Sequence, residues 1–105
     1  TVLGISFKAG SDDLRNSPSV KLVDILNNLG ANVIVHDPYV KNTSDAEMAF
    51  KSPELIIIAT NHKEFKNYKD IMIQSPASLI YDVWGMFQKD DFKNIKYIKF
   101  GESFS

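Results

Sequence analysis

The sequence predicts an α/β protein, a three-layer sandwich around a Rossmann-like, mostly parallel sheet of five strands. Short apolar runs alternate with segments of helical periodicity along the whole chain, and no internal repeat or low-complexity tract interrupts them. A succession of strand, helix and strand also implies right-handed parallel crossovers. We expect the strand order third, second, first, fourth, fifth, because each crossover would move outward from the first strand.

The first strand and helix are predicted from residue type and spacing. Residues 1–5 are apolar and β-branched, as expected of a central strand that is covered on both faces. The helix over 18–29 places its apolar residues on one side, as in a helix that lies on a sheet. Ser17 would supply the N-cap oxygen, Pro18 suits the first helical position, and Gly30 would end the helix.

The middle of the chain predicts two more strands and a short helix. Residues 32–35 form the second strand, and a turn follows because Pro38 biases the preceding residue away from helical backbone angles. Ser44 can cap a helix over 45–50. The most apolar run of the chain, 55–59, should be a buried third strand.

The last third of the chain predicts the remaining elements. We expect one irregular helix over 63–74, a fourth strand over 79–81 that ends at Asp82, a turn of helix over 88–92 and a final strand over 95–100.

Composition limits what the protein can be. A chain of 105 residues with 44% hydrophobic content is long enough for one domain and too short for two, so we expect a single domain over 1–105. The net charge of −1 gives no general attraction to nucleic acid or to an anionic membrane. The sequence has no cysteine and no apolar run near the roughly 20 residues of a membrane span. We therefore expect a soluble, cytoplasmic protein without a thiol nucleophile.

The connection from the first strand to the first helix is unusually long. Such connections take about 2–6 residues, whereas this one runs from 6 to 16. Its basic side chains are Lys8 and Arg15, and the following helix would direct its dipole and the free N–H groups of Ser19 and Val20 toward the same place. This pattern predicts an anion site suited to phosphate. The alternative is a solvated loop in which Arg15 pairs with Asp12 or Asp13.

Polar residues also follow the other strand ends. Because the carboxyl ends of parallel strands meet at one edge of a sheet, we expect a crevice there. It would gather Lys8, Arg15, His36, Asp37, Asn61, His62, Asp82 and Trp84.

Residues of these types at one edge can serve several chemistries, and the sequence bears on each. The five glycines never form the Gly-x-Gly-x-x-Gly turn of a dinucleotide fold, so Asp37 is interpreted as a turn residue before Pro38 and not as a ribose-binding acid. A metal held by histidine and carboxylate is disfavoured by the ligand spacing, and we expect none. Ser6, His62 and Asp82 could form a Ser-His-Asp arrangement, but no Gly-x-Ser-x-Gly elbow supports it.

The segment Gly-Ile-Ser-Phe-Lys-Ala-Gly-Ser-Asp-Asp-Leu-Arg-Asn-Ser-Pro over 4–18, followed by Asp37-Pro38-Tyr39 and Ala-Thr-Asn-His over 59–62, resembles the C-terminal domain of the UDP-glucose/GDP-mannose dehydrogenase family. The resemblance runs over essentially the whole chain. It implies a UDP-sugar-binding domain of a larger NAD-dependent enzyme that oxidises the C6 alcohol of a nucleotide sugar to a carboxylate, for polysaccharide precursors.

The resemblance also implies residue roles and partners. Phe7 and Lys8 would contact the nucleotide sugar, with Lys8 near its diphosphate, and Arg15 would reach the pyrophosphate of NAD. The catalytic cysteine and the NAD fingerprint of the family lie outside this sequence, so we expect no catalytic residue here and no catalysis by the chain alone. The partners would be the remaining domains of the parent, which would form a homo-oligomer. Trp84 stands near a position where many members have an arginine, which leaves the particular sugar open.

A second hypothesis belongs to another class. The chain would be a stand-alone, flavodoxin-like module that senses a ligand or binds a protein partner through the same crevice.

Overall fold

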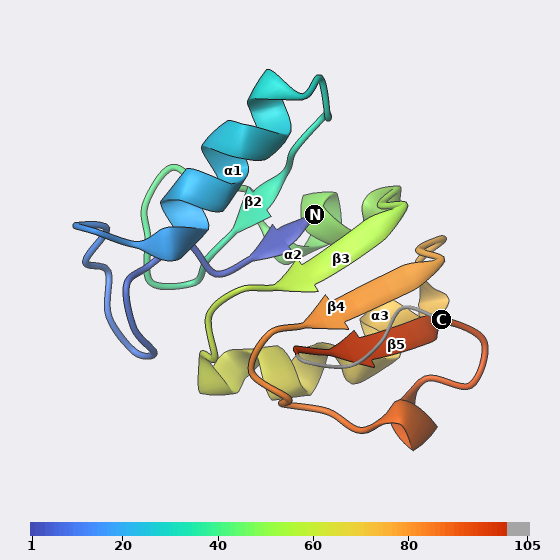
Figure 1. Cartoon of the computed structure of the whole chain (residues 1–105). Helices are drawn as coiled ribbons and strands as arrows, with labels where there is room; N and C mark the ends of the chain where they lie inside the picture. Colours follow the sequence, from blue (N-terminus) through green and yellow to red (C-terminus); the bar gives the residue numbers. More distant parts are fainter. Residues whose placement is uncertain (101–105) are drawn as a thin grey trace.

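The computed structural model describes residues 1–100, which form a five-stranded, wholly parallel sheet between two layers of helices (Figure 1). The predicted α/β class and parallel sheet are confirmed. The elements in chain order are β1 (Val2–Leu3), α1 (Pro18–Asn28), β2 (Val35–His36), α2 (Ala46–Lys51), β3 (Leu55–Ile58), the 3-10 helix η1 (Lys63–Tyr68), α3 (Lys69–Gln74), β4 (Leu79–Asp82), the 3-10 helix η2 (Lys89–Asp91) and β5 (Lys96–Lys99).

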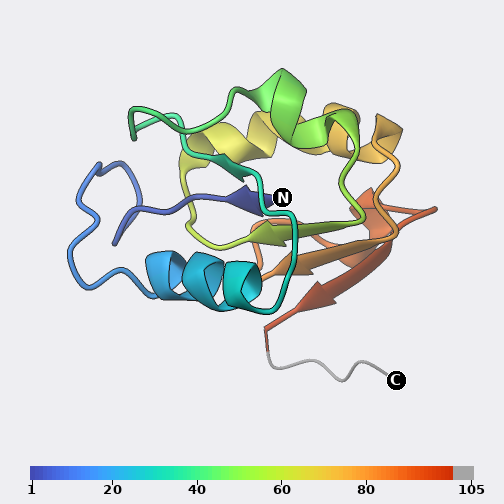
Figure 2. The ribbon, with the colours of Figure 1, turned by 90° about the horizontal axis from the view of Figure 1, so that it is seen from above.

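The strand order is β2-β1-β3-β4-β5, and the predicted order third, second, first, fourth, fifth is wrong. Figure 2 shows the reason, because α1 lies on one face of the sheet whereas α2 and α3 lie on the other. Right-handed crossovers through helices on opposite faces carry the chain in opposite directions. The chain therefore passes from β2 back across β1, and β3 pairs with the far side of β1.

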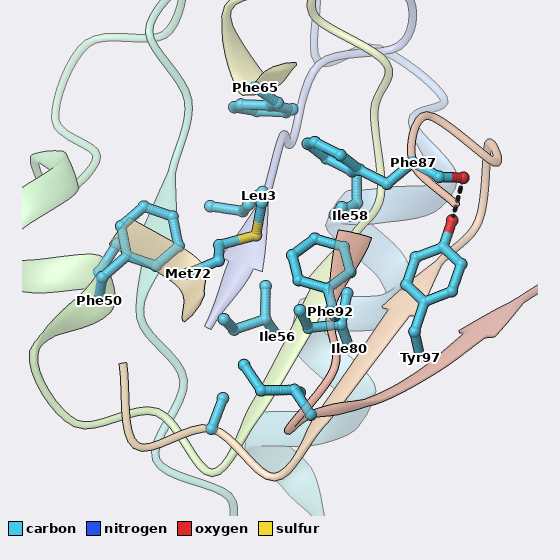
Figure 3. Packing of buried hydrophobic residues seen from close by; sticks show 13 residues of the cluster. Leu3, Phe50, Ile56, Ile58, Phe65, Met72, Ile80, Phe87, Phe92 and Tyr97 are labelled. Atoms are coloured by element: carbon cyan, nitrogen blue, oxygen red, sulfur yellow. Dashed lines mark hydrogen bonds between the residues drawn. The ribbon is translucent and has the colours of Figure 1, made fainter. Parts of the chain in front are cut away.

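The larger core lies under α2, η1 and α3. Side chains of a strand alternate between the two faces, so Leu3, Ile56 and Ile58 point to this side whereas Val2 and Ile57 point toward α1. Phe65 and Met72, both fully buried, close this core from above (Figure 3).

The other face is covered less completely. We expected the apolar residues of the first helix to pack on the sheet, but Ile25 of α1 and Leu29, the residue that follows it, are 55% and 78% exposed. Leu22, Val23 and Leu26 of the same predicted face are partly buried. Across residues 1–100, no helix has the length and apolar character needed to cross a membrane.

The helix ends follow local chemistry. Ser17 and Gly30 take the predicted positions at the two ends of α1, and Gly30 has a φ of +90°. The N-cap of α2 is Asp45 and not Ser44 as predicted, because the Asp45 carboxylate accepts the Met48 N–H at 2.8 Å. Ser44 instead donates its N–H to the Val35 carbonyl, which keeps it in the ladder beside β2.

Candidate functional site

The long loop over 6–16 starts from a tightly packed turn after β1. Gly4 has a φ of +92° and donates its N–H to the His36 carbonyl at 2.9 Å. On the other side, the Thr60 hydroxyl, just after β3, donates to the Ser6 carbonyl at 3.1 Å. The loop therefore leaves β1 in a fixed direction between the ends of β2 and β3.

The buried carboxylate of Asp37 holds the first residues of the loop. Its Oδ2 accepts the N–H groups of Ile5 at 2.8 Å and Ser6 at 3.1 Å, and its Oδ1 accepts the N–H of Tyr39 at 2.9 Å. Asp37 is 2% exposed, and several strong donors compensate the loss of water around its charge. The predicted turn role is therefore correct, and Asp37 also ties the end of β2 to the loop.

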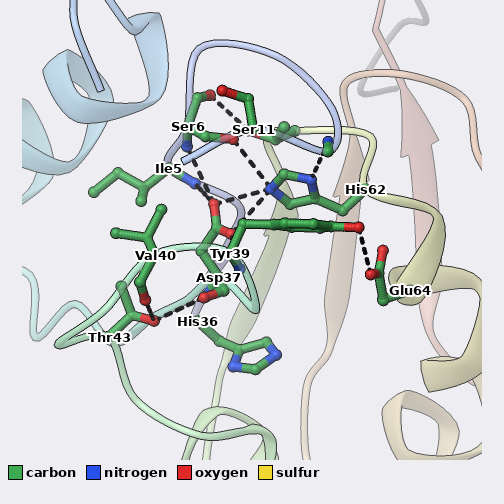
Figure 4. A network of polar contacts seen from close by, with 12 residues as sticks. Ile5, Ser6, Ser11, His36, Asp37, Tyr39, Val40, Thr43, His62 and Glu64 are labelled. Carbon is green, nitrogen blue, oxygen red and sulfur yellow. Dashed lines mark hydrogen bonds and ion pairs between the residues drawn. The ribbon is translucent and has the colours of Figure 1, made fainter. Parts of the chain in front are cut away.

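His62 is fully buried beside Asp37, and its ring contacts the loop through both nitrogens (Figure 4). Nε2 lies 3.0 Å from the Asp37 carboxylate, and Nδ1 accepts the Gly10 N–H at 3.0 Å. A nitrogen that accepts an N–H carries no proton, so the ring is neutral with its proton on Nε2. The Tyr39 ring packs against it with centroids 4.6 Å apart.

The hydroxyl of Ser6 completes this cluster, but it is not a nucleophile. It donates to the Lys8 carbonyl at 3.0 Å, and its Oγ lies 3.1 Å from His62 Nε2. In a Ser-His-Asp triad the serine and the carboxylate contact opposite nitrogens of the imidazole. Here Ser6 and Asp37 share one nitrogen, and Asp82 takes no part, so the arrangement Ser6, His62 and Asp82 is corrected to a structural cluster with Asp37.

The anchored loop carries two exposed side chains. Phe7 is 51% exposed and Lys8 is exposed as well. Their backbone is held, because Phe7 donates its N–H to the Asp13 carbonyl at 2.6 Å and Lys8 accepts the Ser6 hydroxyl. A fixed backbone with an aromatic ring and an ammonium group directed to solvent is suited to binding an anionic ligand that has an apolar part.

Arg15 pairs with Asp13, as the solvated-loop alternative proposed. Its Nε and Nη2 donate to the two carboxylate oxygens at 3.1 and 3.0 Å, and the Arg15 side chain is 87% exposed. The hydrogen bonds from Arg15 lower the pKa of Asp13 to about 2. Nη1 makes no contact with Asp13, so the guanidinium can still meet a second anion.

The start of α1 is less open than predicted. The Ser19 N–H, expected to be free, donates to the Ser17 hydroxyl oxygen at 3.2 Å, and Ser19 is buried. The Ser17 hydroxyl in turn donates to the Ile5 carbonyl at 2.7 Å. The start of α1 therefore holds the loop in place. Because the Ser19 N–H is already bonded, it is not available to bind an anion as we expected.

A second polar cluster lies after β4. The buried Asp82 accepts the N–H groups of Trp84 and Phe87 and, at 2.6 Å, the hydroxyl of Tyr97. Trp84 is 53% exposed and donates its indole N–H to the Ala59 carbonyl at 3.0 Å, so it covers the sheet edge. Of the predicted crevice residues, Asp37 and His62 thus lie in the loop cluster, and Asp82 and Trp84 lie in this separate one.

His36 belongs to neither cluster. Its Nδ1 lies 2.7 Å from the Ser44 carbonyl and its Nε2 lies 2.9 Å from the Tyr68 hydroxyl, beneath the loop. Within the described range 1–100, no group of three or more histidine, cysteine, aspartate or glutamate side chains could hold a metal ion.

Sequence reasoning missed two contributors to the loop cluster. The Gly10 N–H gives no signal in the sequence beyond the turn that glycine allows. Tyr39 packs on His62 and donates its hydroxyl to Glu64 at 2.5 Å, a bond that lowers the pKa of Glu64 and raises the pKa of Tyr39. The position of Tyr39 directly after Asp37 and Pro38 is the feature of the sequence that could have indicated its contact with the loop cluster.

Comparison with known proteins identifies what this arrangement is similar to. Residues 1–89 match the family model described as "UDP-glucose/GDP-mannose dehydrogenase family, UDP binding domain". A UDP-N-acetyl-D-mannosamine dehydrogenase of Pyrococcus horikoshii is 46% identical over 67 residues, which cover 63% of this chain and 16% of that protein. A UDP-glucose 6-dehydrogenase of Rickettsia prowazekii is 33% identical and aligns with 91% of this chain and 26% of its own length.

Solved structures agree with these relatives. The UDP-D-ManNAc dehydrogenase of Pyrococcus horikoshii superposes with a TM-score of 0.81 at 33% identity, over 93% of this chain and 24% of that one. The UDP-N-acetyl-mannosamine dehydrogenase Cap5O of S. aureus gives a TM-score of 0.82 at 28% identity, over 95% and 25% of the two chains. The chain thus spans about a quarter or less of the length of these relatives.

Proposed function

Since the chain belongs to the UDP-glucose/GDP-mannose dehydrogenase family and corresponds to its UDP binding domain, we propose that it binds the nucleotide part of a UDP-sugar for a larger 6-dehydrogenase. The parent would oxidise the C6 alcohol of the sugar to a carboxylate. The relatives are named as dehydrogenases of UDP-glucose and of UDP-N-acetyl-D-mannosamine, which supports a nucleotide sugar as substrate. The stand-alone sensing or interaction module is not favoured by these relatives.

One observation carries the proposal: buried groups hold the backbone of the loop that presents Phe7 and Lys8. Asp37 accepts N–H groups of Ile5 and Ser6, and His62 accepts the N–H of Gly10. The exposed ends of Phe7 and Lys8 are therefore available to a ligand without the cost of ordering their backbone. Lys8 would meet the diphosphate and Phe7 the adjoining part of the nucleotide sugar.

Arg15 is the candidate for contact with NAD in the parent enzyme. Its planar guanidinium is exposed and keeps Nη1 beyond the pair with Asp13, which fits a phosphate oxygen of a pyrophosphate. No Gly-x-Gly-x-x-Gly turn occurs in the sequence, so the rest of an NAD site would belong to the remaining domains of the parent. NAD, when bound there, would supply the hydride acceptor, and Arg15 would only hold and orient it.

The whole enzyme is part of the same proposal. It would use NAD, supply uronate-type precursors for polysaccharide synthesis, act in the cytoplasm and assemble as a homo-oligomer. The sequence has no cysteine, so a covalent thiol step would also depend on another domain.

Titration of the ¹⁵N-labelled chain with UDP-glucose tests the binding proposal. We expect shifts of the amide signals at Phe7 and Lys8, with an affinity of about millimolar because most of the parent's site is absent. Lys8→Ala should weaken binding about tenfold or more, the effect of one lost charge-assisted contact. Lys51→Ala is the matched control, because Lys51 is an exposed lysine at the end of α2, next to the opposite edge of the sheet.

The two variants separate a site from general attraction. Equal weakening by Lys8→Ala and Lys51→Ala would indicate only nonspecific charge, and no shift at Phe7 or Lys8 in the wild type would contradict the proposal.

A further inference from the structure

The loop segment 6–10 is closed around the ring of His62. Its first residue, Ser6, places its Oγ 3.1 Å from Nε2, and its last residue, Gly10, donates its N–H to Nδ1 at 3.0 Å. Phe7 and Lys8 lie between these two contacts in the chain. One buried ring therefore determines the distance between the two ends of the segment that carries both exposed side chains (Figure 4).

The ring itself is held in one orientation. Tyr39 packs on it with centroids 4.6 Å apart, and Phe65 packs edge-on at 5.4 Å. The Asp37 carboxylate accepts the Nε2 proton at 3.0 Å, which fixes which nitrogen faces Gly10. His62 is 0% exposed, so water does not compete for these contacts.

We propose that His62, in its neutral form with the proton on Nε2, is a positioning residue that sets the Phe7–Lys8 segment for the UDP-sugar. This inference rests on the proposed function, because it assigns a role toward that ligand. His62 would not touch the ligand. It would act through the Ser6 hydroxyl and the Gly10 backbone N–H, and its loss would change where the Lys8 ammonium and the Phe7 ring lie.

The tautomer can be measured first, in the wild-type chain. Long-range ¹H–¹⁵N spectra of the imidazole should show a protonated Nε2 and an unprotonated Nδ1 for His62 at neutral pH. A proton on Nδ1 would overturn the proposal without any variant.

Two substitutions then separate hydrogen bonding from size. His62→Gln retains an acceptor and a donor that can meet Gly10 and Asp37, and it does not titrate near neutral pH. His62→Leu fills the space without either hydrogen bond. His36→Gln is the control, because His36 is the other histidine of the sequence and contacts Ser44 and Tyr68 instead of the loop.

UDP-glucose is the probe, measured at neutral pH. It is preferable to UDP, whose terminal phosphate has an ionisation near 6, like other phosphate monoesters. We expect His62→Leu to weaken binding about tenfold, and His62→Gln to stay within about threefold of the wild type. His36→Gln should bind UDP-glucose as the wild type does.

The outcomes distinguish this inference from the function on which it rests. Absence of any UDP-glucose response in the wild type would contradict the proposed function, and the positioning role would then be judged by the Phe7 and Lys8 amide signals. These signals should differ between the wild type and His62→Leu, and identical signals would overturn the role. It would equally be overturned by wild-type affinity in folded His62→Leu, or by equal weakening of binding in His62→Gln and His62→Leu.

Discussion

Gly4 and Thr60 lie so close that a side chain at position 4 has no space. A Cβ built on Gly4 would come within 2.4 Å of the Thr60 Cβ and 2.9 Å of the Thr60 backbone nitrogen. Gly4 also has a φ of +92°, a backbone conformation that residues with a side chain rarely adopt. This contact brings the end of β1 against the residue that follows β3 and sets the direction of the loop that carries Phe7 and Lys8.

Replacement of Gly4 should therefore destabilise the fold more than replacement of Gly30, which has a similar φ of +90° but nothing within 4 Å of its Cβ position. Gly30→Ala should cost about 1–2 kcal/mol from backbone strain alone. Gly4→Ala should cost about 1–3 kcal/mol more, because the clash forces the neighbouring strand end to move. Urea unfolding measures the free energy of unfolding of both variants. Equal losses in the two would show that Thr60 can move away at little cost.

Ser17 is expected to stabilise both α1 and the loop. Its oxygen accepts the Ser19 N–H, and its hydroxyl donates to the Ile5 carbonyl. Ser17→Ala should lower the free energy of unfolding by about 1–2 kcal/mol, since both bonds are lost. Ser44→Ala is the comparison, because Ser44 makes its contacts with Val35 and His36 through the backbone. A loss no greater than that of Ser44→Ala would argue against the cap.

The pair of Arg15 and Asp13 predicts a titration. Hydrogen bonds from Arg15 lower the pKa of Asp13 to about 2, so the pair should persist above the ordinary carboxylate pKa and be lost as the pH falls toward 2. In Arg15→Gln the Asp13 pKa should rise toward the ordinary aspartate value of 3.8. Carboxyl ¹³C NMR follows this directly. The matched control is Lys21→Gln, which changes an exposed lysine of α1 and should leave the Asp13 pKa unchanged. If the Asp13 pKa is also unchanged in Arg15→Gln, the pair does not form in solution.

The chain of 105 residues should unfold in one cooperative step, as expected of a single domain with its own core. Trp84, the one tryptophan of the sequence, reports on the end of β4, and far-UV circular dichroism reports on all helices and strands. Urea curves from the two signals should coincide. Two separated transitions would show that the half of the sheet around β4 and β5 unfolds independently.

Much of the fold was determined by local sequence. The apolar runs indicated the five strands, and Ser17 and Gly30 marked the ends of α1. The ligand site predicted from the length of the loop over 6–16 stays a prediction. These features depend on residue type and spacing within one segment. They could be predicted because hydrophobic patterning and helix capping depend on residues that are close together in the chain.

The order of the strands depended on the tertiary structure. It follows from the face of the sheet that each helix covers, and the short α2, with Ala49 and Phe50 as its buried residues, carries no local mark of which face it takes. In the predicted order, β1 would have lain between β2 and β4, with Asp37 and Asp82 beside its loop. In the structure β1 lies between β2 and β3, so the loop meets Asp37 and His62, and Asp82 binds Tyr97 on the far side. The sequence alone thus determined which residues would stand at the carboxyl edge of the sheet, whereas only the packing of α1 and α2 on opposite faces decided which of them would hold the loop.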